Sequence, residues 1–444
     1  MSQSTPISSL DVYLNALESR ASEAVIELGL DRVQAVYQRL FAPEAFKQVG
    51  IVTVAGTNGK GSTVAFAEAM ALAAGRSVAA YTSPHISVFN ERLRLDGDSV
   101  GDDDWLAAFQ AVDGASQGVQ LTYFEQVTAA ALVLIERAQP ELALLEVGLG
   151  GRLDAVNGVD PDVAVLTSIG LDHMEYLGPT RTDIGREKLG IARADRPLVI
   201  AERDWPAALE LDLVNTQADL RRVGEAFDWR VEASMGSQPR VWSLTVNTRP
   251  RPTSLVLPPP GLIGAHQMGN AAAAMVALAE LWGEPFLKTP AVVKGIEQVR
   301  LPGRFETVAR APDVIVDVAH NEASAHALAA ALSDHPSAGR TWAVFSAFGD
   351  KPVEAMAAAL ADEVDHWWVA GLDGPRGLSA EALVRRLKNG GITTGLDAVK
   401  SIPQALDQSL AQAQPDDRIV VFGSFQVLSQ VASRWGREGV SNDG

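Results

Sequence analysis

The hydrophobic residues in the first half of this chain gather in short continuous runs that alternate with longer helical patterns. Runs without polar alternation are typical of parallel strands buried on both faces of a sheet. They predict strands at residues 49–55, 77–81, 142–147, 163–169 and 198–201. We therefore expect a doubly wound, mostly parallel sheet in this part of the chain.

Residues 220–257 have a different pattern, and we assign no site residue to the segment 203–257. Segments 229–233 and 241–246 alternate apolar and polar positions, which predicts a small antiparallel subsheet. The segment Pro258-Pro-Pro-Gly261 then interrupts the pattern, and residues 267–282 read as an alanine-rich helix.

The alternation of strands and helices resumes after residue 313, with strands expected at 314–318, 341–345, 366–370 and 418–422. The segment Leu301-Pro-Gly-Arg304 has the composition of a linker. We therefore predict an α/β protein of two domains, residues 1–300 and residues 301–444, the second with a Rossmann-like sheet.

A glycine-rich turn, Gly56-Thr-Asn-Gly-Lys-Gly-Ser62, lies between the first predicted strand and a helix. In this context backbone N–H groups and a helix N-terminus close around phosphate oxygens, and a lysine neutralises their charge. The turn is a variant P-loop, because Gly61 stands where Ser or Thr usually follows the lysine. It predicts a nucleotide ligand and a first domain like that of a P-loop ATPase.

The composition narrows the classes of partner. The net charge of −18 argues against a nucleic-acid or anionic-membrane binder, because both need basic surfaces. The 0 cysteines exclude disulfides, thiolate metal sites and a cysteine nucleophile. No signal peptide and no apolar run long enough to span a bilayer are evident, so we expect a cytoplasmic protein that acts on small molecules. Because no surface feature marks an interface, we expect a monomer.

Polar residues follow several predicted strands at their carboxyl ends, where open α/β sheets bind ligands. Ser83, Glu146 and His173 come at or after strands of the first sheet, and Asp317 closes a strand of the second. If the strands carrying the first three residues neighbour the phosphate-loop strand, a hydroxyl, a carboxylate and an imidazole meet near the phosphates. Such ligands suit Mg²⁺ bound jointly with a nucleotide.

Each of these residues also has a plain structural interpretation. Ser83 beside a proline could be a turn residue, Glu146 could pair with an arginine in the core, and His173 could cap a helix. Lys188 would ordinarily be a solvated helix lysine. Their common placement favours the functional interpretation.

Nine ordered motifs give the chain a resemblance to a known family. It resembles the Mur-ligase superfamily of ATP-dependent amide ligases, and within it the bacterial bifunctional dihydrofolate synthase/folylpolyglutamate synthases. The motifs are Gly56-Thr-Asn-Gly-Lys-Gly-Ser62, Ser83-Pro-His with Glu91-Arg, Leu121-Thr-Tyr-Phe-Glu125, Leu145-Glu-Val-Gly-Leu-Gly-Gly-Arg-Leu-Asp154, Thr167-Ser-Ile-Gly-Leu-Asp-His173, Gly185-Arg-Glu-Lys188, His266-Gln-Met-Gly-Asn270, Leu301-Pro-Gly-Arg304 and Asp317-Val-Ala-His-Asn321. The chain departs from the family at Glu322 and in the loop 345–351, to which we assign no role in the chemistry.

The resemblance implies an acyl-phosphate mechanism. A pteroate or folate carboxylate attacks the γ-phosphate of ATP, and the amine of L-glutamate then attacks the acyl phosphate. Phosphorylation supplies the leaving group that a free carboxylate lacks, so catalysis rests on positioning and charge neutralisation.

The resemblance also implies roles for the motif residues. ATP is expected at Thr57, Asn58, Gly59, Lys60, Gly61, Ser62, Asn270, Arg304, Asp317 and His320. One Mg²⁺ is expected at Ser83 and Glu146, and a second at His173. Lys188 matches a lysine that the family carries as a carbamate, and it forms the expected catalytic set with Lys60 and His173.

The pterin of the acceptor is expected at Gly29, Leu30, Thr122, Tyr123, Phe124, Glu125, Leu153, Asp154 and Ala155. Phe124 offers a ring for stacking, and Asp154 suits the amino and ring N–H groups of a pterin.

Three alternatives stay open on the sequence. One is a folylpolyglutamate synthase without the dihydrofolate activity, and another is a peptidoglycan-type Mur ligase. The segment Leu121-Thr-Tyr-Phe-Glu125, Gly61 and a phosphate loop beginning near residue 56 favour the folate branch over the latter. The third is a regulatory P-loop NTPase, against which the second α/β domain with Arg304 and Asp317 argues.

Overall fold

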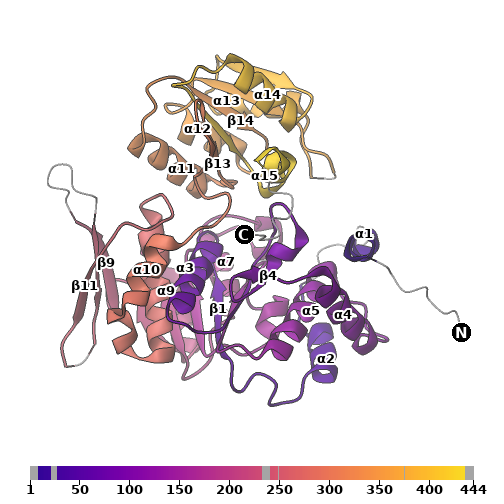
Figure 1. Ribbon diagram of the computed structural model, residues 1–444, viewed down its shortest axis with the longest axis vertical. Helices are drawn as coiled ribbons and strands as arrows, with labels where there is room; N and C mark the ends of the chain where they lie inside the picture. The colour runs from indigo at the N-terminus through magenta and orange to yellow at the C-terminus, as the bar shows by residue number, and fades with distance from the viewer. Residues whose placement is uncertain (1–8, 22–27, 233–240, 249, 375, 436–444) are drawn as a thin grey trace, which may run out of the picture.

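The computed structural model describes residues 9–21, 28–232, 241–248, 250–374 and 376–435, which form two α/β units (Figure 1). The first unit contains an eight-stranded and a three-stranded sheet, and the second contains a six-stranded sheet. In Figure 1 the second unit, coloured orange to yellow, stands above the first. The expected two-part α/β fold with a small antiparallel subsheet is confirmed.

The large sheet of the first unit is parallel apart from one edge. Its strand order is β4 (Asp98–Ser99), β3 (Leu93–Leu95), β2 (Val78–Tyr81), β5 (Leu142–Glu146), β1 (Gly50–Ala55), β6 (Val163–Leu166), β7 (Pro197–Ile200) and β8 (Asp219–Arg222). Strand β3 pairs antiparallel with β2 and with β4, and all other pairs are parallel. The phosphate-loop strand β1 therefore lies in the interior of the sheet, between β5 and β6.

Helices cover both faces of this sheet, as buried parallel strands require. One face packs against α1 (Leu10–Ala21), α2 (Asp31–Leu40), α4 (Asp102–Ala115), α5 (Tyr123–Ala138), α6 (Met174–Leu177), α7 (Arg181–Leu189) and α8 (Glu210–Asn215). The other face packs against α3 (Lys60–Ala73), α9 (His266–Trp282) and α10 (Pro290–Gln298).

The three-stranded sheet is antiparallel and has the order β11 (Thr253–Leu257), β10 (Trp242–Val246) and β9 (Phe227–Val231). Its buried side chains Trp242 and Leu244 join the core formed by α3 and α9. The last residue of the strand predicted at 229–233 lies outside the described residues.

The second unit repeats the layered plan. Its sheet has the order β12 (Glu306–Ala309), β13 (Asp313–Val316), β17 (Arg418–Phe422), β14 (Thr341–Phe345), β15 (His366–Ala370) and β16 (Leu396–Val399). Only β12 runs antiparallel to its neighbour within this sheet. Helices α11 (Glu322–Asp334), α12 (Val353–Leu360) and α13 (Ala380–Asn389) cover one face, and α14 (Ile402–Gln412) and α15 (Phe425–Ala432) cover the other.

Candidate active site

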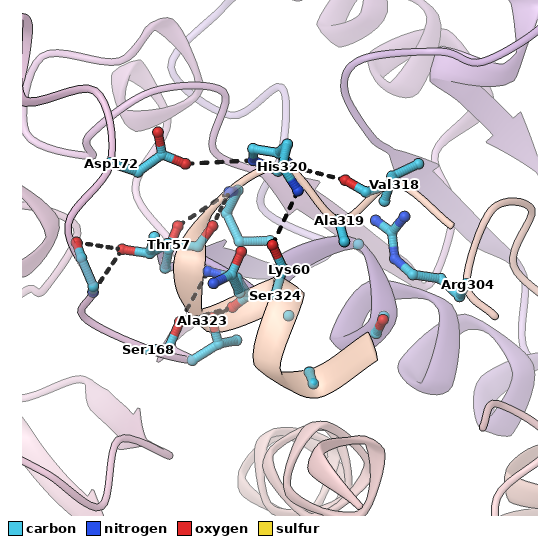
Figure 2. Close-up of a pocket in the computed structure, with 18 of the residues that line it drawn as sticks. Thr57, Lys60, Ser168, Asp172, Arg304, Val318, Ala319, His320, Ala323 and Ser324 are labelled. Atoms are coloured by element: carbon cyan, nitrogen blue, oxygen red, sulfur yellow. Dashed lines mark hydrogen bonds and ion pairs between the residues drawn. The ribbon is translucent and has the colours of Figure 1, made fainter. Parts of the chain in front are cut away.

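A cavity of about 890 Å³ lies between the two units. Its walls come from the phosphate loop and from the carboxyl ends of β5, β6 and β13, together with the N-terminal parts of α9, α11 and α15. The expected ATP, metal and catalytic residues all line it: Thr57, Asn58, Gly59, Lys60, Gly61, Ser62, Ser83, Glu146, His173, Lys188, Asn270, Arg304, Asp317 and His320. Figure 2 shows the centre of this cavity, with residues of both units facing one another.

The phosphate loop is held in shape by the segment that follows β6. The backbone N–H of Asn58 donates to Ser168 Oγ at 2.9 Å, and Thr167 Oγ1 donates to the Asn58 carbonyl at 2.6 Å. Lys60 Nζ donates to the Gly56 carbonyl at 3.0 Å, which holds the ammonium over the loop. These contacts preorganise the loop to receive phosphate oxygens.

Gly59 cannot be replaced without strain. Its φ is 87°, in the left-handed region that favours glycine, and a Cβ there would lie 2.4 Å from Asn270 Oδ1. The absent side chain thus lets the loop approach α9 closely, and α3 begins at the next residue, Lys60.

Glu146 is a buried carboxylate with spare hydrogen-bonding capacity. It is 6% exposed and accepts one hydrogen bond, from the backbone N–H of Ser83 at 3.3 Å. Burial raises its pKa, against the opposing charges of Lys60 and Arg304. Of the three strands that carry Ser83, Glu146 and His173, β5 and β6 neighbour β1, whereas β2 pairs with β5 instead. Ser83 still reaches Glu146, because the loop after β2 passes over the end of β5.

His173 directly precedes helix α6 and turns the chain there with a φ of 52°, but its side chain forms no capping hydrogen bond. Burial lowers the pKa of its imidazole to about 4, which keeps the ring neutral and able to act as a ligand at neutral pH. Its Nε2 lies 3.9 Å from Asp172 Oδ1.

Lys188 is not a solvated helix lysine. It is 3% exposed near the end of α7, and burial followed by the charge of Lys60 lowers its pKa to about 7. A large fraction of this amine is therefore neutral and nucleophilic at neutral pH.

Asp172 joins the two units through a buried polar network. It accepts from Lys351 Nζ at 2.6 Å and from Asn321 Nδ2 at 3.0 Å, and His320 Nε2 lies 3.3 Å away. Burial opposes ionisation, but the hydrogen bond with His320 and the charge of Lys351 hold the pKa of Asp172 well below its usual range. Asn321 and Asn58 also exchange side-chain hydrogen bonds, so the phosphate loop itself is tied to the second unit.

Two further charged residues of the second unit face the phosphate loop. Asp317 accepts from the backbone N–H groups of Phe305 and Ala319, both at 2.8 Å, which fixes its carboxylate at the end of β13. Burial raises the pKa of Asp317 and lowers that of Arg304, while each charge favours the ionised form of the other. The Arg304 guanidinium lies 5.6 Å from the ring centroid of Phe425.

The nine residues expected at the pterin do not line this cavity within the described residues. Thr122 and Glu125 form a capping box at the start of α5, and Arg32 donates to Glu125 at 2.9 Å. The ring of Phe124 lies directly against Gly148, where an added Cβ would come within 2.4 Å of it. Since Gly148 lines the cavity, Phe124 stands behind its wall.

Asp154 is 3% exposed, and both of its carboxylate oxygens are engaged. Oδ2 accepts from Leu149 N–H and Oδ1 from Val156 N–H, each at 2.9 Å, so the side chain also caps the short helix η2 (Ala155–Gly158). Burial raises its pKa to about 6. Gly29 and Leu30 precede α2, and Leu153 and Ala155 flank Asp154.

Several residues that the sequence did not single out line the cavity. Arg203 and Trp229 come from the segment to which no site was assigned, with the guanidinium 4.8 Å from the indole centroid. Lys351 comes from the loop 345–351, and Asp172 precedes the expected ligand His173. An unusual loop sequence was the one signal for Lys351, and no signal marked Arg203 or Trp229.

Two features are absent from the described ranges. None of the helices is long and apolar enough to cross a membrane. In the same part of the chain, no three His, Cys, Asp or Glu side chains are grouped to hold a metal ion. Any metal near Glu146 would therefore need ligands besides these side chains, such as the Ser83 hydroxyl, phosphate oxygens and water.

One α/β unit carries a phosphate loop, and a second α/β unit faces it across a cavity that holds a buried carboxylate and a buried lysine. This arrangement is that of a nucleotide-dependent ligase. Sequence models for the Mur ligase middle domain and for the Mur ligase glutamate ligase domain match residues 54–278 and 303–425. The chain belongs to the Mur ligase family, in its dihydrofolate synthase/folylpolyglutamate synthase branch.

Relatives in this branch match over nearly the whole chain. The dihydrofolate synthase/folylpolyglutamate synthase of Escherichia coli (strain K12) is 38% identical over 436 residues, which cover 96% of this chain and 95% of the relative. The structure of E. coli FolC in complex with DHPP and ADP has a TM-score of 0.87 at 37% identity, covering 97% of this chain and 99% of that one. A bifunctional folylpolyglutamate synthase/dihydrofolate synthase with Mn, AMPPNP and L-glutamate bound has a TM-score of 0.84 at 35% identity, covering 98% and 99%.

Proposed function

We propose that this chain is an ATP-dependent ligase that adds L-glutamate to dihydropteroate and to reduced folates. The observation that carries the proposal is the interdomain cavity, in which the phosphate loop, Glu146 and Lys188 face the charged residues of the second unit. Relatives that bind ADP, DHPP and L-glutamate support this choice of substrates.

The reaction proceeds in two steps. A carboxylate oxygen of the acceptor attacks the γ-phosphorus of ATP, the bond to the β-phosphate oxygen breaks, and ADP leaves. The amine of L-glutamate then attacks the carbonyl carbon of the acyl phosphate, loses a proton, and expels inorganic phosphate as the amide forms. Each step needs aligned reactants and neutralised phosphate charge, which a preorganised cavity supplies.

The chain's own cations serve the first step. Lys60, held over the loop by the Gly56 carbonyl, neutralises charge on the β- and γ-phosphates. Asn270 and Arg304 hold the nucleotide from α9 and from the loop before β12, and the fixed carboxylate of Asp317 accepts from the ribose hydroxyls. His320 packs beside them at the junction of the two units.

The donor set near the phosphate loop fits Mg²⁺. Glu146 keeps most of its acceptor capacity unused, and Ser83 offers a hydroxyl beside it, so both suit an oxygen-preferring cation. A neutral His173 suits a second site. Such cations would supply charge neutralisation on the transferring phosphoryl group.

We propose that Lys188 carries CO₂ as a carbamate. A buried amine with a pKa near 7 has the neutral form that this modification requires, and the product anion would offset the charge of Lys60. The carbamate would orient the incoming glutamate amine or a cation.

Lys188→Met is expected to lower kcat by about a hundredfold or more, because it removes that anion from the centre of the cavity. Carbamate formation should rise as pH increases through about 7, since a larger fraction of the amine is then neutral. ¹³C NMR of the enzyme in ¹³C-bicarbonate measures it directly. The wild-type spectrum should show a carbamate signal that is absent from the spectrum of Lys188→Met. A wild type without this signal, or a variant that keeps it, would refute the modification.

Asp154→Ala is expected to raise the KM for dihydropteroate far more than the KM for ATP, since the pterin is proposed to contact this residue. The variant also loses two hydrogen bonds from backbone N–H groups. We therefore expect its free energy of unfolding to fall by about 1 kcal/mol, the value of a lost helix cap. Steady-state kinetics with each substrate varied in turn separates the effects. Equal increases in both KM values would contradict a pterin role.

We assign residues 1–300 to the nucleotide and pterin domain and residues 301–444 to the glutamate-ligase domain. The family matches, which break between 278 and 303, support that division. The monomeric state and the cytoplasmic location stay predictions from the sequence.

The proposal is tested by incubating the full chain with ATP, Mg²⁺, L-glutamate and either dihydropteroate or a tetrahydrofolate monoglutamate. ADP release and product mass should show one added glutamate on both acceptors. Addition to the folate alone would restrict the activity to polyglutamylation. ATP hydrolysis with neither acceptor modified would favour another Mur-type substrate or a regulatory NTPase.

A further inference from the structure

Arg92 is a buried cation outside the set of residues assigned above. It ends the short helix η1 (Phe89–Arg92) and is 7% exposed. Its guanidinium lies between two aromatic rings, 5.6 Å from the Phe89 centroid and 5.8 Å from the Tyr123 centroid. Its Nε donates to His85 Nδ1 at 3.0 Å.

The charge of Arg92 has no partner within the described residues. No carboxylate there forms an ion pair with it, and its Nη1 and Nη2 atoms donate no hydrogen bond. The adjacent acid, Glu91, is already engaged by the backbone N–H groups that precede it. Arg94, two residues on, forms an ion pair with Glu68 at 2.6 Å.

An unpaired buried cation is costly, because it loses its hydration without gaining an opposite charge. The two aromatic rings attract the guanidinium face but leave the N–H groups at its edge unused. Those groups form a planar fork that matches a carboxylate. The unused N–H groups of Arg92 can therefore pair with a carboxylate brought by a ligand.

The position of Arg92 indicates which ligand. His85 lines the interdomain cavity beside Ser83, and Tyr123 belongs to the segment expected at the pterin. Because His85 Nδ1 accepts from Arg92, the imidazole proton sits on Nε2, where it is a second donor. Arg92 thus contacts one residue of the cavity wall, His85, and one residue of the segment expected at the pterin, Tyr123, although it does not itself line the cavity.

We propose that Arg92 binds the non-reacting carboxylate of a glutamate already attached to the acceptor, and so serves glutamylated folates specifically. This inference rests on the proposed function. Dihydropteroate has a single carboxylate, which is phosphorylated, so it leaves Arg92 unpaired. A folate monoglutamate has a second carboxylate that needs a counter-charge when the cavity closes.

The test is the affinity of the full chain for dihydropteroate and for a tetrahydrofolate monoglutamate, measured by calorimetry and alongside each KM. Arg92→Met should raise the Kd of the folate about 10- to 100-fold, because a charge-assisted hydrogen bond is lost. The Kd of dihydropteroate should rise less than about threefold. Arg92→Lys should restore part of the folate affinity. Arg76→Met is the matched control, because Arg76 also stacks on an aromatic ring but has its own acid, Glu141, and should change neither value.

Equal weakening for both ligands, or no change in a folded Arg92→Met variant, would overturn the inference. If that variant does not fold, the ratio of the two affinities in Arg92→Lys and Arg92→Gln decides in the same way. A wild-type chain that binds both ligands but ligates neither would refute the proposed function. The role of Arg92 would then be decided by how its substitution changes the ratio of the two Kd values. A wild-type chain that binds neither ligand would overturn both.

Discussion

A Lys60→Ala variant is expected to lose at least about a thousandfold in kcat, with its fold intact. The lysine supplies the positive charge nearest to the phosphoryl group that is transferred, and preorganised charges of this kind contribute about 2.7–4 kcal/mol to the transition state. Its Nζ contacts two loop carbonyls rather than an acid, so removing it breaks no ion pair.

Steady-state kinetics of product formation measure the effect of Lys60→Ala, and thermal unfolding checks its stability. Lys47→Ala is a suitable control, because Lys47 is an exposed lysine of the same unit. Turnover within a few fold of the wild type would rule out a phosphate role for the loop.

Replacing Asp172 with alanine is expected to weaken the contact between the two units and lower kcat/KM by about a hundredfold or more. The substitution leaves Lys351, which is 5% exposed, with Asp350 at 3.4 Å as its remaining acid, and breaking a buried pair costs about 3–5 kcal/mol. It also removes the acid that Asn321 and His320 contact, which weakens the alignment of the second unit with the phosphate loop.

Small-angle scattering should show a larger radius of gyration for Asp172→Ala than for the wild type. The double variant Asp172→Ala with Lys351→Met removes both charges, and it should recover stability relative to Asp172→Ala alone while staying impaired in turnover. A compact Asp172→Ala variant with normal kinetics would show that the network does not hold the units together.

The phosphate loop and the strands around it could be predicted because their signals are local. Strand β1, the glycines and Lys60 are contiguous in the sequence. The apolar run that forms β1 is too short to be read as a helix. Strands β8 and β16 could not be predicted, because both lie at sheet edges, are partly exposed and lack an apolar run. The order of the strands also escaped prediction, so the sequence left open whether β2, β5 and β6 neighbour β1.

The interdomain network was out of reach for a different reason. Lys351 and Asp172 lie 179 residues apart, and neither belongs to a spacing pattern that marks a pair. A lone lysine in a loop reads as solvated, and only the fold reveals that both side chains are buried. Lys188 was included through its motif, but its burial and its lowered pKa follow from the packing of α7 against the sheet.

The most direct test of the account follows an oxygen atom. Dihydropteroate labelled with ¹⁸O in its carboxylate is incubated with the chain, ATP, Mg²⁺ and L-glutamate, and the products are analysed by mass spectrometry. An acyl-phosphate mechanism predicts one ¹⁸O in inorganic phosphate for each amide formed, because the attacking oxygen leaves with the phosphorus. Amide formation with unlabelled phosphate, or with the label in AMP, would contradict the mechanism, and no amide at all would contradict the function.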